Sequence, residues 1–116
     1  MHIDFESYNE KYQLTFSIKS YDNNNLAILI MCKDSDGFVE PFATMTTNIC
    51  TFNNDTLACI DTNNFPEALD LIDKYNLGTY TGKKIPSGYC EYPVYDMNLN
   101  EIKKYEYVRD WWKQII

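Results

Sequence analysis

"YQLTFSIKSYDNNNLAILIMCKDSDG", residues 12–37, is the stretch that decides which fold to expect. From Tyr12 to Ile18 apolar side chains alternate with polar ones, which is the period of a strand with one face in solvent. Residues 26–33 are apolar on both faces, as in a buried strand. "DNNN" between the two supplies residues that tolerate left-handed turns, and "KDSDG" supplies a second turn. The stretch therefore predicts an antiparallel hairpin that leads into a further strand.

The same kind of pattern continues on both sides of this hairpin. Residues 38–49 mix threonine with aromatic residues, as strands do, and Pro41 suits an edge strand or a bulge. Residues 3–8 and 57–60 predict two more strands, and residues 89–95 predict another in which Pro93 again indicates an edge. Residues 79–88 contain Gly82 and Gly88 and are predicted to form a loop.

After residue 61 the hydrophobic period changes to that of a helix. Four apolar side chains lie on one helical face: Phe65, Ala68, Leu69 and Ile72. Asn63 or Asn64 is the expected N-cap, and Asn76 or Gly78 is the expected left-handed residue at the end. The pattern predicts a helix of about three turns over residues 65–76.

A second helical stripe closes the sequence and begins behind Asn98 or Asn100. It runs from Leu99 as far as Trp112, and the neighbouring Trp111 points to a different face. Together these patterns predict one α+β domain over residues 1–116. We expect an antiparallel, meander-like sheet of about five or six strands, one short helix packed on a face of the sheet, and a C-terminal helix.

The composition indicates a globular chain, and the spacing of its reactive residues predicts neither catalytic nor metal chemistry. Apolar residues make up 45% and aromatic residues 16%, which is enough to form a core. The four cysteines lie in apolar segments at irregular spacing, so we expect reduced, buried thiols: Cys32, Cys50, Cys59 and Cys90. No cysteine pair has the spacing of a zinc knuckle, and His2 is the only histidine. No motif pairs a nucleophile with a base, so we expect a protein that is not an enzyme and holds no cofactor.

The charge is unevenly distributed along the chain. Residues 1–70 carry eleven acidic residues against three lysines, a net charge of −8, whereas residues 71–116 carry six against seven, a net charge of +1. An acidic surface repels phosphates and anionic lipid, so we expect neither direct nucleic-acid binding nor membrane binding. The longest apolar run, residues 26–32, is too short to span a membrane and lies away from the N-terminus, and we expect a cytoplasmic protein.

Two explanations of the acidity stay open, namely a solvated surface that maintains solubility or a face directed at a basic protein partner. In the second case the expected contact residues lie in or beside the acidic turns: Asp34, Asp36, Glu40 and Asp55. The alternative contact residues belong to the predicted glycine-containing loop and to later aromatic positions: Lys83, Lys84, Tyr92 and Trp111.

About a third of the chain, residues 61–98, resembles a known family. The shared pattern consists of Asp61, Asn63, Asn64 and Pro66, a helix ending near Leu77 and Gly78, then Thr81, Gly82, Ser87, Gly88, Tyr92, Pro93 and Tyr95. It is similar to domain of unknown function 4313, a family that recurs on bacterial phages, plasmids and conjugative elements. Most of these residues also have a purely structural explanation as turn and cap residues.

The resemblance implies no established activity, although small acidic proteins of such elements include inhibitors of host defence nucleases. It therefore implies a non-enzymatic binding or inhibitor protein of the anti-CRISPR kind, acting on a basic surface of a host protein such as a CRISPR or other defence nuclease. The alternative is a small structural or interaction domain whose partner is not selected by charge.

Overall fold

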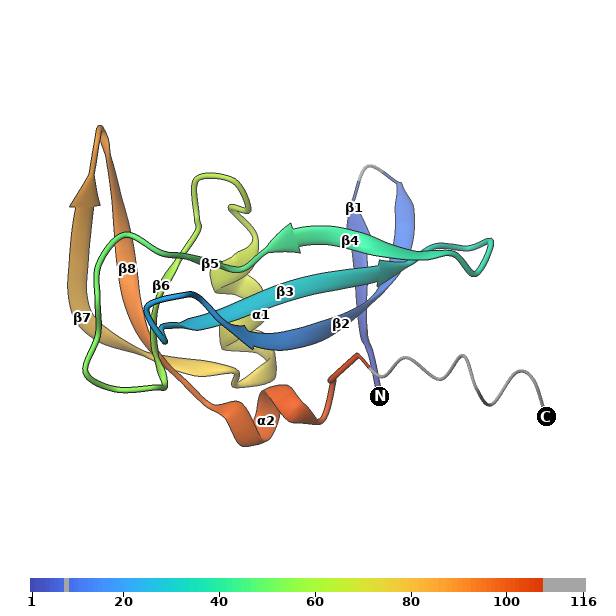
Figure 1. Cartoon of the computed structure of the whole chain (residues 1–116). Helices are drawn as coiled ribbons and strands as arrows, with labels where there is room; N and C mark the ends of the chain where they lie inside the picture. The colour runs from blue at the N-terminus through green and yellow to red at the C-terminus, as the bar shows by residue number, and fades with distance from the viewer. Residues whose placement is uncertain (8, 108–116) are drawn as a thin grey trace.

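The computed structural model describes residues 1–7 and 9–107 and arranges them as two four-stranded antiparallel sheets with two short helices (Figure 1). The predicted α+β class is confirmed. The expected single sheet of five or six strands is wrong, because the described strands number eight and divide between two sheets.

The first sheet is the predicted meander. It contains β1 (Ile3–Ser7), β2 (Glu10–Ser20), β3 (Leu26–Lys33) and β4 (Val39–Thr44), which pair in sequence order and antiparallel. The hairpin predicted from residues 12–37 is present, and Asn24 adopts the left-handed conformation expected of its turn, with φ 69°. Pro41 lies in an edge strand beside a register shift, as predicted, because Ala43 pairs with Ile30 but Pro41 with Met31.

The second sheet contains β5 (Thr46–Thr47), β6 (Leu57–Ile60), β7 (Gly78–Ser87) and β8 (Cys90–Met97), in the order β5-β6-β8-β7. The prediction of one strand over residues 38–49 is wrong, because the chain passes from the first sheet to the second at Met45. Met45 is fully buried, donates its N–H to the carbonyl of Ile28 (2.9 Å) and accepts from the N–H of Asp61 (2.8 Å). This residue therefore connects the sheets instead of continuing a strand.

The predicted loop over residues 79–88 is wrong as well, because this segment is largely the edge strand β7. The glycine signal marks a bulge between Tyr80 and Lys84, where Gly82 has φ 86°. The predicted edge position of Pro93 is also wrong, since β8 lies between β6 and β7. Pro93 is tolerated there because it lies one residue beyond the last β6–β8 pair and directly beside the bulge, where the ladder is incomplete.

Helix α1 (Ala68–Tyr75) is shorter at its start than predicted, and neither Asn63 nor Asn64 is its N-cap. Pro66 disfavours the helical conformation in the residue before it, so the helix begins only after Glu67, which makes no side-chain cap bond. Instead the Asp61 carboxylate organises the preceding turn by accepting from the N–H (3.2 Å) and amide nitrogen (2.9 Å) of Asn64. The predicted end is confirmed, with Asn76 in the left-handed conformation at φ 56°.

Helix α2 (Leu99–Lys103) begins at the predicted N-cap Asn98, whose side chain accepts from the N–H of Glu101 at 3.4 Å. The expected continuation of this helix is wrong within the described residues. Phe16 of β2 donates to the carbonyl of Tyr105 (2.9 Å) and accepts from the N–H of Tyr107 (2.7 Å), so the chain pairs with β2 at this point. Trp111 and Trp112 lie outside the described residues. No helix of the described part is long and apolar enough to cross a membrane.

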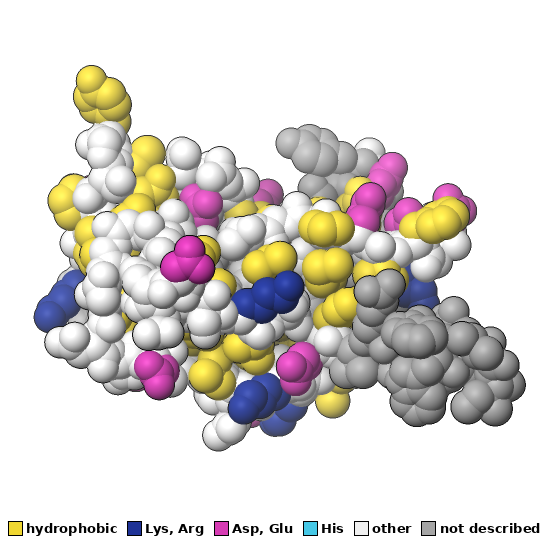
Figure 2. Space-filling model, viewed as in Figure 1, with side chains coloured by type: hydrophobic (Ala, Val, Ile, Leu, Met, Phe, Trp, Pro, Cys, Tyr) yellow, Lys and Arg dark blue, Asp and Glu magenta, His cyan; other side chains and the backbone are white. Residues whose placement is uncertain are grey.

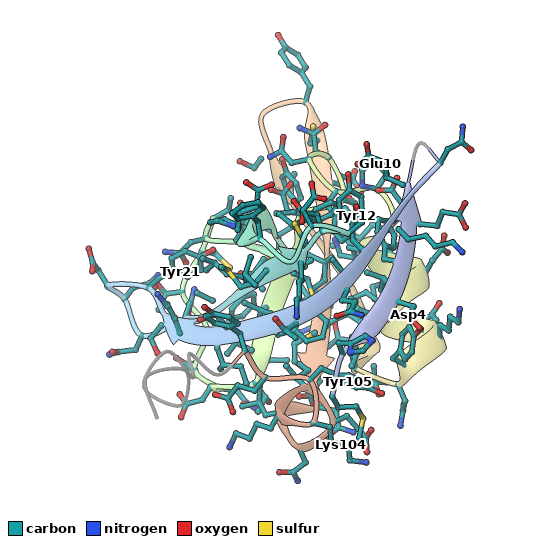
Figure 3. The ribbon with its side chains drawn as sticks, turned by 90° about the vertical axis from the view of Figure 1, so that its right-hand side faces the viewer. Asp4, Glu10, Tyr12, Tyr21, Lys104 and Tyr105 are labelled. Atoms are coloured by element: carbon teal, nitrogen blue, oxygen red, sulfur yellow. The ribbon has the colours of Figure 1, made fainter. Side chains whose placement is uncertain are left out.

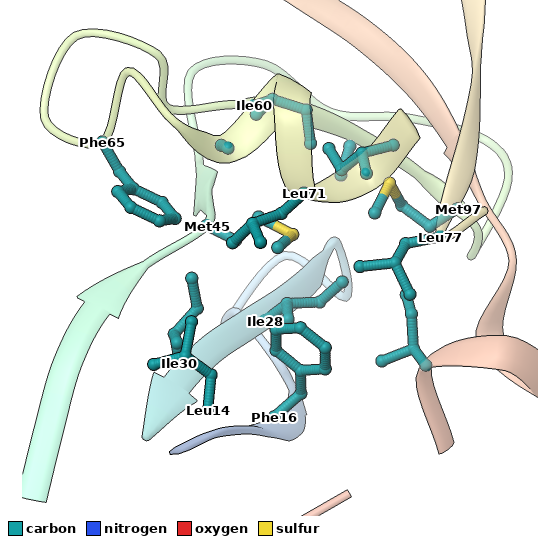
Figure 4. Packing of buried hydrophobic residues seen from close by; sticks show 14 of the residues in the cluster. Leu14, Phe16, Ile28, Ile30, Met45, Ile60, Phe65, Leu71, Leu77 and Met97 are labelled. Atoms are coloured by element: carbon teal, nitrogen blue, oxygen red, sulfur yellow. The ribbon is translucent and has the colours of Figure 1, made fainter. Parts of the chain in front are cut away.

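One cluster of buried side chains joins the two sheets and α1 (Figure 4). β2 and β3 contribute Leu14, Phe16, Ile28 and Ile30, and α1 faces them with Ala68, Leu71 and Ile72. Each fully buried leucine, isoleucine or phenylalanine side chain stabilises the fold by roughly 1.5–3 kcal/mol. The core therefore fixes β3, and the turn beyond its end, residues 34–40, lies outside the cluster.

Candidate protein-contact site

The turn between β3 and β4 is held by the side chain of Asp34. Its carboxylate accepts from the backbone N–H groups of Asp36 (2.9 Å) and Phe38 (3.1 Å). Backbone bonds close the same turn, since Asp34 donates to the carbonyl of Phe38 (3.0 Å) and accepts from Gly37 (3.1 Å). Gly37 has φ 88°, a conformation that side chains other than glycine rarely adopt. We call residues 34–40 the β3–β4 tip.

The β3–β4 tip presents a hydrophobic ring among carboxylates. Phe38 is 71% exposed and Val39 is also exposed, although few large apolar side chains of the described chain are exposed. Asp36 and Glu40 are exposed beside them, whereas Asp34 is half-buried because it serves the turn. Figure 2 shows acidic and hydrophobic side chains together at this end of the molecule. An exposed aromatic ring bordered by charge makes the tip a candidate for protein contact.

The base of the tip is fixed by aromatic packing. Phe42 is the extra residue at the register shift of β4, and its ring packs against Phe5 and Phe65, each with centroids 5.7 Å away. Tyr12 adds a third contact, with its ring centroid 5.7 Å from that of Phe42. The tip therefore projects from a packed platform, which lowers the conformational entropy lost when a partner binds.

Three of the four predicted acidic contact residues come together here, and the fourth does not. Asp34, Asp36 and Glu40 belong to the β3–β4 tip, whereas Asp55 is exposed in the loop between β5 and β6. That loop bonds to Asn25 at the start of β3, the opposite end of the strand from the tip. Because β3 has eight residues, the two ends are roughly 26 Å apart. Asp55 therefore belongs to a different surface.

A hollow of about 750 Å³ opens beside the tip and carries both signs of charge. The charged side chains that line it are Asp4, Glu6, Lys11, Lys33, Asp34 and Lys74. Among the described residues the ion pairs are His2 with Asp4 (3.2 Å) and Lys104 with Glu101 (2.8 Å), so the lysines of the hollow are not ion-paired there. This mixed lining favours neither a simple cation nor a simple anion as a ligand.

Two side chains at the base of the tip have raised pKa values. The hydrogen bond of the Tyr12 hydroxyl to the Glu10 carboxylate (2.6 Å) is the main reason that the pKa of Tyr12 is raised (Figure 3). Burial raises the pKa of the Cys32 thiol, and the carboxylates of Glu40 and Asp34 add to this effect. Glu40 and Asp34 therefore lie near enough to Cys32 to disfavour its thiolate form.

Three of the four alternative contact residues lie in the β7–β8 hairpin and differ in exposure. Lys83 and Lys84 are exposed at the bulge of β7, whereas Tyr92 is half-buried in β8 opposite Ile85. The pKa of Tyr92 is raised, first by burial and then by Cys90. Trp111 lies outside the described residues. Lysines and a bulge on an edge strand also prevent unwanted strand pairing, which explains Lys83 and Lys84 without a partner.

Two exposed aromatic residues, Phe38 and Tyr89, lie at hairpin turns, whereas the sequence pattern predicted strand positions for both. Phe38 follows the predicted "KDSDG" turn directly, so an aromatic residue placed next to a turn was the available signal. Tyr89 is fully exposed at the turn between β7 and β8, where Figure 2 shows a hydrophobic side chain projecting from the molecule. Both positions were assigned to strands, in which exposure alternates and is not decided by residue type.

The histidine and the cysteines of the described residues lie apart from any metal-binding group. His2 is exposed and contacts only the carboxylate of Asp4 among described acidic groups. Within residues 1–7 and 9–107, no three His, Cys, Asp or Glu side chains are grouped so that they could hold a metal ion. Cys32 and Cys59 are buried as expected, but Cys50 and Cys90 are only half-buried.

A family model described as a domain of unknown function (DUF4313) matches residues 15–114. The chain belongs to this family, as its resemblance over residues 61–98 indicated. No curated protein and no solved structure shows significant similarity to the chain.

Proposed function

We propose that this member of the DUF4313 family is a non-enzymatic binding protein that contacts a basic surface of a partner protein through the β3–β4 tip. The observation that carries the proposal is the ring of Phe38, 71% exposed on a turn fixed by Asp34 and bordered by the carboxylates of Asp36 and Glu40. An exposed ring supplies contact area that is lost from water on binding, and the carboxylates select a cationic rim.

The proposed setting is the cytoplasm of a bacterial cell that carries a mobile element encoding this protein. The partner that fits the acidic tip is a host protein with a positively charged nucleic-acid channel, such as a CRISPR or other defence nuclease. Such channels follow a phosphate backbone with lysine and arginine, so an acidic tip competes for the same groups. In this setting the protein acts as an inhibitor by occupying the channel.

A second candidate is a structural or interaction domain whose partner is not selected by charge. It is favoured by Tyr89, which is fully exposed at the turn between β7 and β8 with no acidic residue other than Glu91 nearby in the sequence. On this hypothesis binding depends on the β7–β8 turn and is insensitive to salt.

Charge reversal with a matched control separates the two candidates. Asp36→Lys with Glu40→Lys changes the tip, and Asp22→Lys with Asp55→Lys makes the same change in net charge on exposed residues near the opposite end of β3. The wild-type chain and both double variants are used to capture host proteins, which are identified by mass spectrometry. The proposal predicts a basic protein that binds the wild type and the control but not the tip variant. Equal capture by all three would favour the second candidate.

A further inference from the structure

Two of the four cysteines lie against each other. The register of β5 and β6 pairs Thr47 with Cys59, and Cys50 follows Thr47 by three residues in the loop that leads from β5 to β6. The thiol of Cys50 lies close enough to that of Cys59 to contribute to the raised pKa of Cys59. Cys59 is 1% exposed, whereas Cys50 is half-buried and reachable from solvent. The sulfur of Cys50 is therefore accessible to solvent, whereas that of Cys59 is buried.

The loop that carries Cys50 is held in place by the side chain of Asn25. Its amide nitrogen donates to the carbonyl of Cys50 and to the side-chain oxygen of Asn48 (2.9 Å), and its oxygen accepts from the N–H of Phe52 (3.0 Å). Asn25 is only 6% exposed, so these bonds are shielded from water. The backbone on both sides of Cys50 is thus fixed without any covalent link between the sulfurs.

We propose that Cys50 and Cys59 are a site of reversible covalent modification, at which a low-molecular-weight disulfide of the glutathione type converts the two thiols into an intramolecular disulfide. In the first step the thiolate of Cys50 attacks one sulfur of the oxidant, whose S–S bond breaks and releases one thiol. In the second step the sulfur of Cys59 loses its proton to solvent and attacks the sulfur of Cys50, and the second thiol leaves. Two protein thiols are oxidised and one external disulfide is reduced to two thiols.

The surroundings of each thiol set the order of these steps. Burial raises the pKa of Cys59 to about 11, and contact with Cys50 adds to this, so Cys59 is a poor first nucleophile. The half-buried Cys50 therefore reacts first with the oxidant. The mixed disulfide on Cys50 then places a leaving group beside Cys59, which allows the second step.

The remaining cysteines lack this arrangement among the described residues. The thiol of Cys32 is buried and its charged neighbours are the carboxylates of Glu40 and Asp34, while that of Cys90 contacts Tyr92. Cys50 and Cys59 also lie near the start of β3, away from the β3–β4 tip, so this inference does not depend on the proposed function.

The test uses the whole chain, reduced and then exposed to oxidised glutathione. Remaining thiols are alkylated in denaturant, and cleavage before Asp55 separates Cys50 from Cys59 for peptide mapping. We expect a protein that has lost two hydrogens, with Cys50 linked to Cys59 and only Cys32 and Cys90 alkylated. A stable glutathione adduct on Cys50 with Cys59 still alkylated would overturn the inference, as would four alkylated thiols or a link to another cysteine.

Two further comparisons test whether the native fold creates the site. The link should form faster in the folded chain than in denaturing urea, and it should leave the circular dichroism spectrum unchanged. Cys59→Ser should accumulate the glutathione adduct on Cys50, whereas Cys90→Ser should form the link like the wild type. Faster formation in urea, or loss of the link in Cys90→Ser, would contradict the inference even if one variant folded poorly.

Discussion

The carboxylate of Asp34 accepts a hydrogen bond from the backbone N–H of Phe38 at 3.1 Å. The same carboxylate also accepts from the backbone N–H of Asp36 (2.9 Å), so it holds the turn. Asp34 is half-buried. The acidic residues of the tip therefore have different tasks. Asp34 shapes the turn, while Asp36 and Glu40 remain exposed beside the ring of Phe38.

This division predicts different stability effects for neighbouring aspartates. Asp34→Ala should lower the free energy of unfolding by about 1–2 kcal/mol, because two backbone N–H groups lose their acceptor. Asp36→Ala should change it by less than about 0.5 kcal/mol, since its side chain is exposed. Urea unfolding of the two variants measures the difference. Equal effects would show that the Asp34 bonds contribute nothing to the turn.

The ring of Phe38 should matter for binding and not for folding. Phe38→Ala should leave the free energy of unfolding within about 0.5 kcal/mol of the wild type, because the ring is mostly exposed. Its loss should weaken partner binding by about 2 kcal/mol or more, as for the central aromatic residue of an interface. Tyr89→Ala is the matched control, and isothermal titration gives both affinities. Stronger weakening by the control would assign the contact to the other hairpin.

Association with a basic partner should be steered by charge. Raising the ionic strength should slow association much more than it changes dissociation, because exposed charges are screened beyond roughly 10 Å at about 0.1 M salt. The double variant Asp36→Lys with Glu40→Lys should lose most of this salt dependence. Stopped-flow association rates at several salt concentrations provide the measurement, and an unchanged salt slope in the variant would argue against a contact at the tip.

Asn25 should be the most costly polar residue of the β2–β3 turn to replace. Asn25→Ala removes three hydrogen-bonding contacts to the loop at residues 48–52 and should destabilise the protein by about 2–3 kcal/mol. Asn53→Ala, at an exposed loop position, should cost less than about 0.5 kcal/mol. Thermal unfolding checks both values. A mild effect at Asn25 would mean that the loop is held by other contacts.

The raised pKa of the Cys59 thiol predicts that the folded chain loses stability in alkali. Its pKa in the folded chain is about 11, above the ordinary value near 9. Between these values the unfolded chain has released this proton while the folded chain keeps it, so the free energy of unfolding falls as the pH rises from about 9 to about 11. Cys59→Ala should flatten this part of the pH profile in urea unfolding. An unchanged slope would assign the alkaline loss to the tyrosines instead.

The hydrophobic pattern was sufficient for the first sheet and insufficient for the second. In residues 12–37 the strand period and the turn residues agree, so β2, β3 and their hairpin could be predicted. In β7 the period-two pattern is hidden by the bulge at Gly82, and pairing with β8 decides the structure. Met45 gave no local sign that the chain changes sheets, because its role depends on contacts with Ile28 and Asp61.

The site was predictable only in part for a similar reason. The acidic turn could be found because aspartate and glycine are turn residues, and three of the four predicted acidic residues lie in or beside it. Its separation from Asp55 depends on which end of β3 each loop meets, and this is a property of the topology. The exposure of Phe38 depends on the direction of the turn, which the Asp34 carboxylate fixes.

Site-specific photo-crosslinking inside cells of the proposed bacterial host tests the central claim most directly. A photoreactive phenylalanine analogue is placed at residue 38 in one variant, at residue 89 in a second and at residue 53 in a third, and cross-linked host proteins are identified by mass spectrometry. The account predicts one basic, nucleic-acid-binding protein captured from residue 38 and not from residues 53 or 89. Capture from residue 89 with none from residue 38 would contradict it, because the partner would then meet the β7–β8 turn and not the β3–β4 tip.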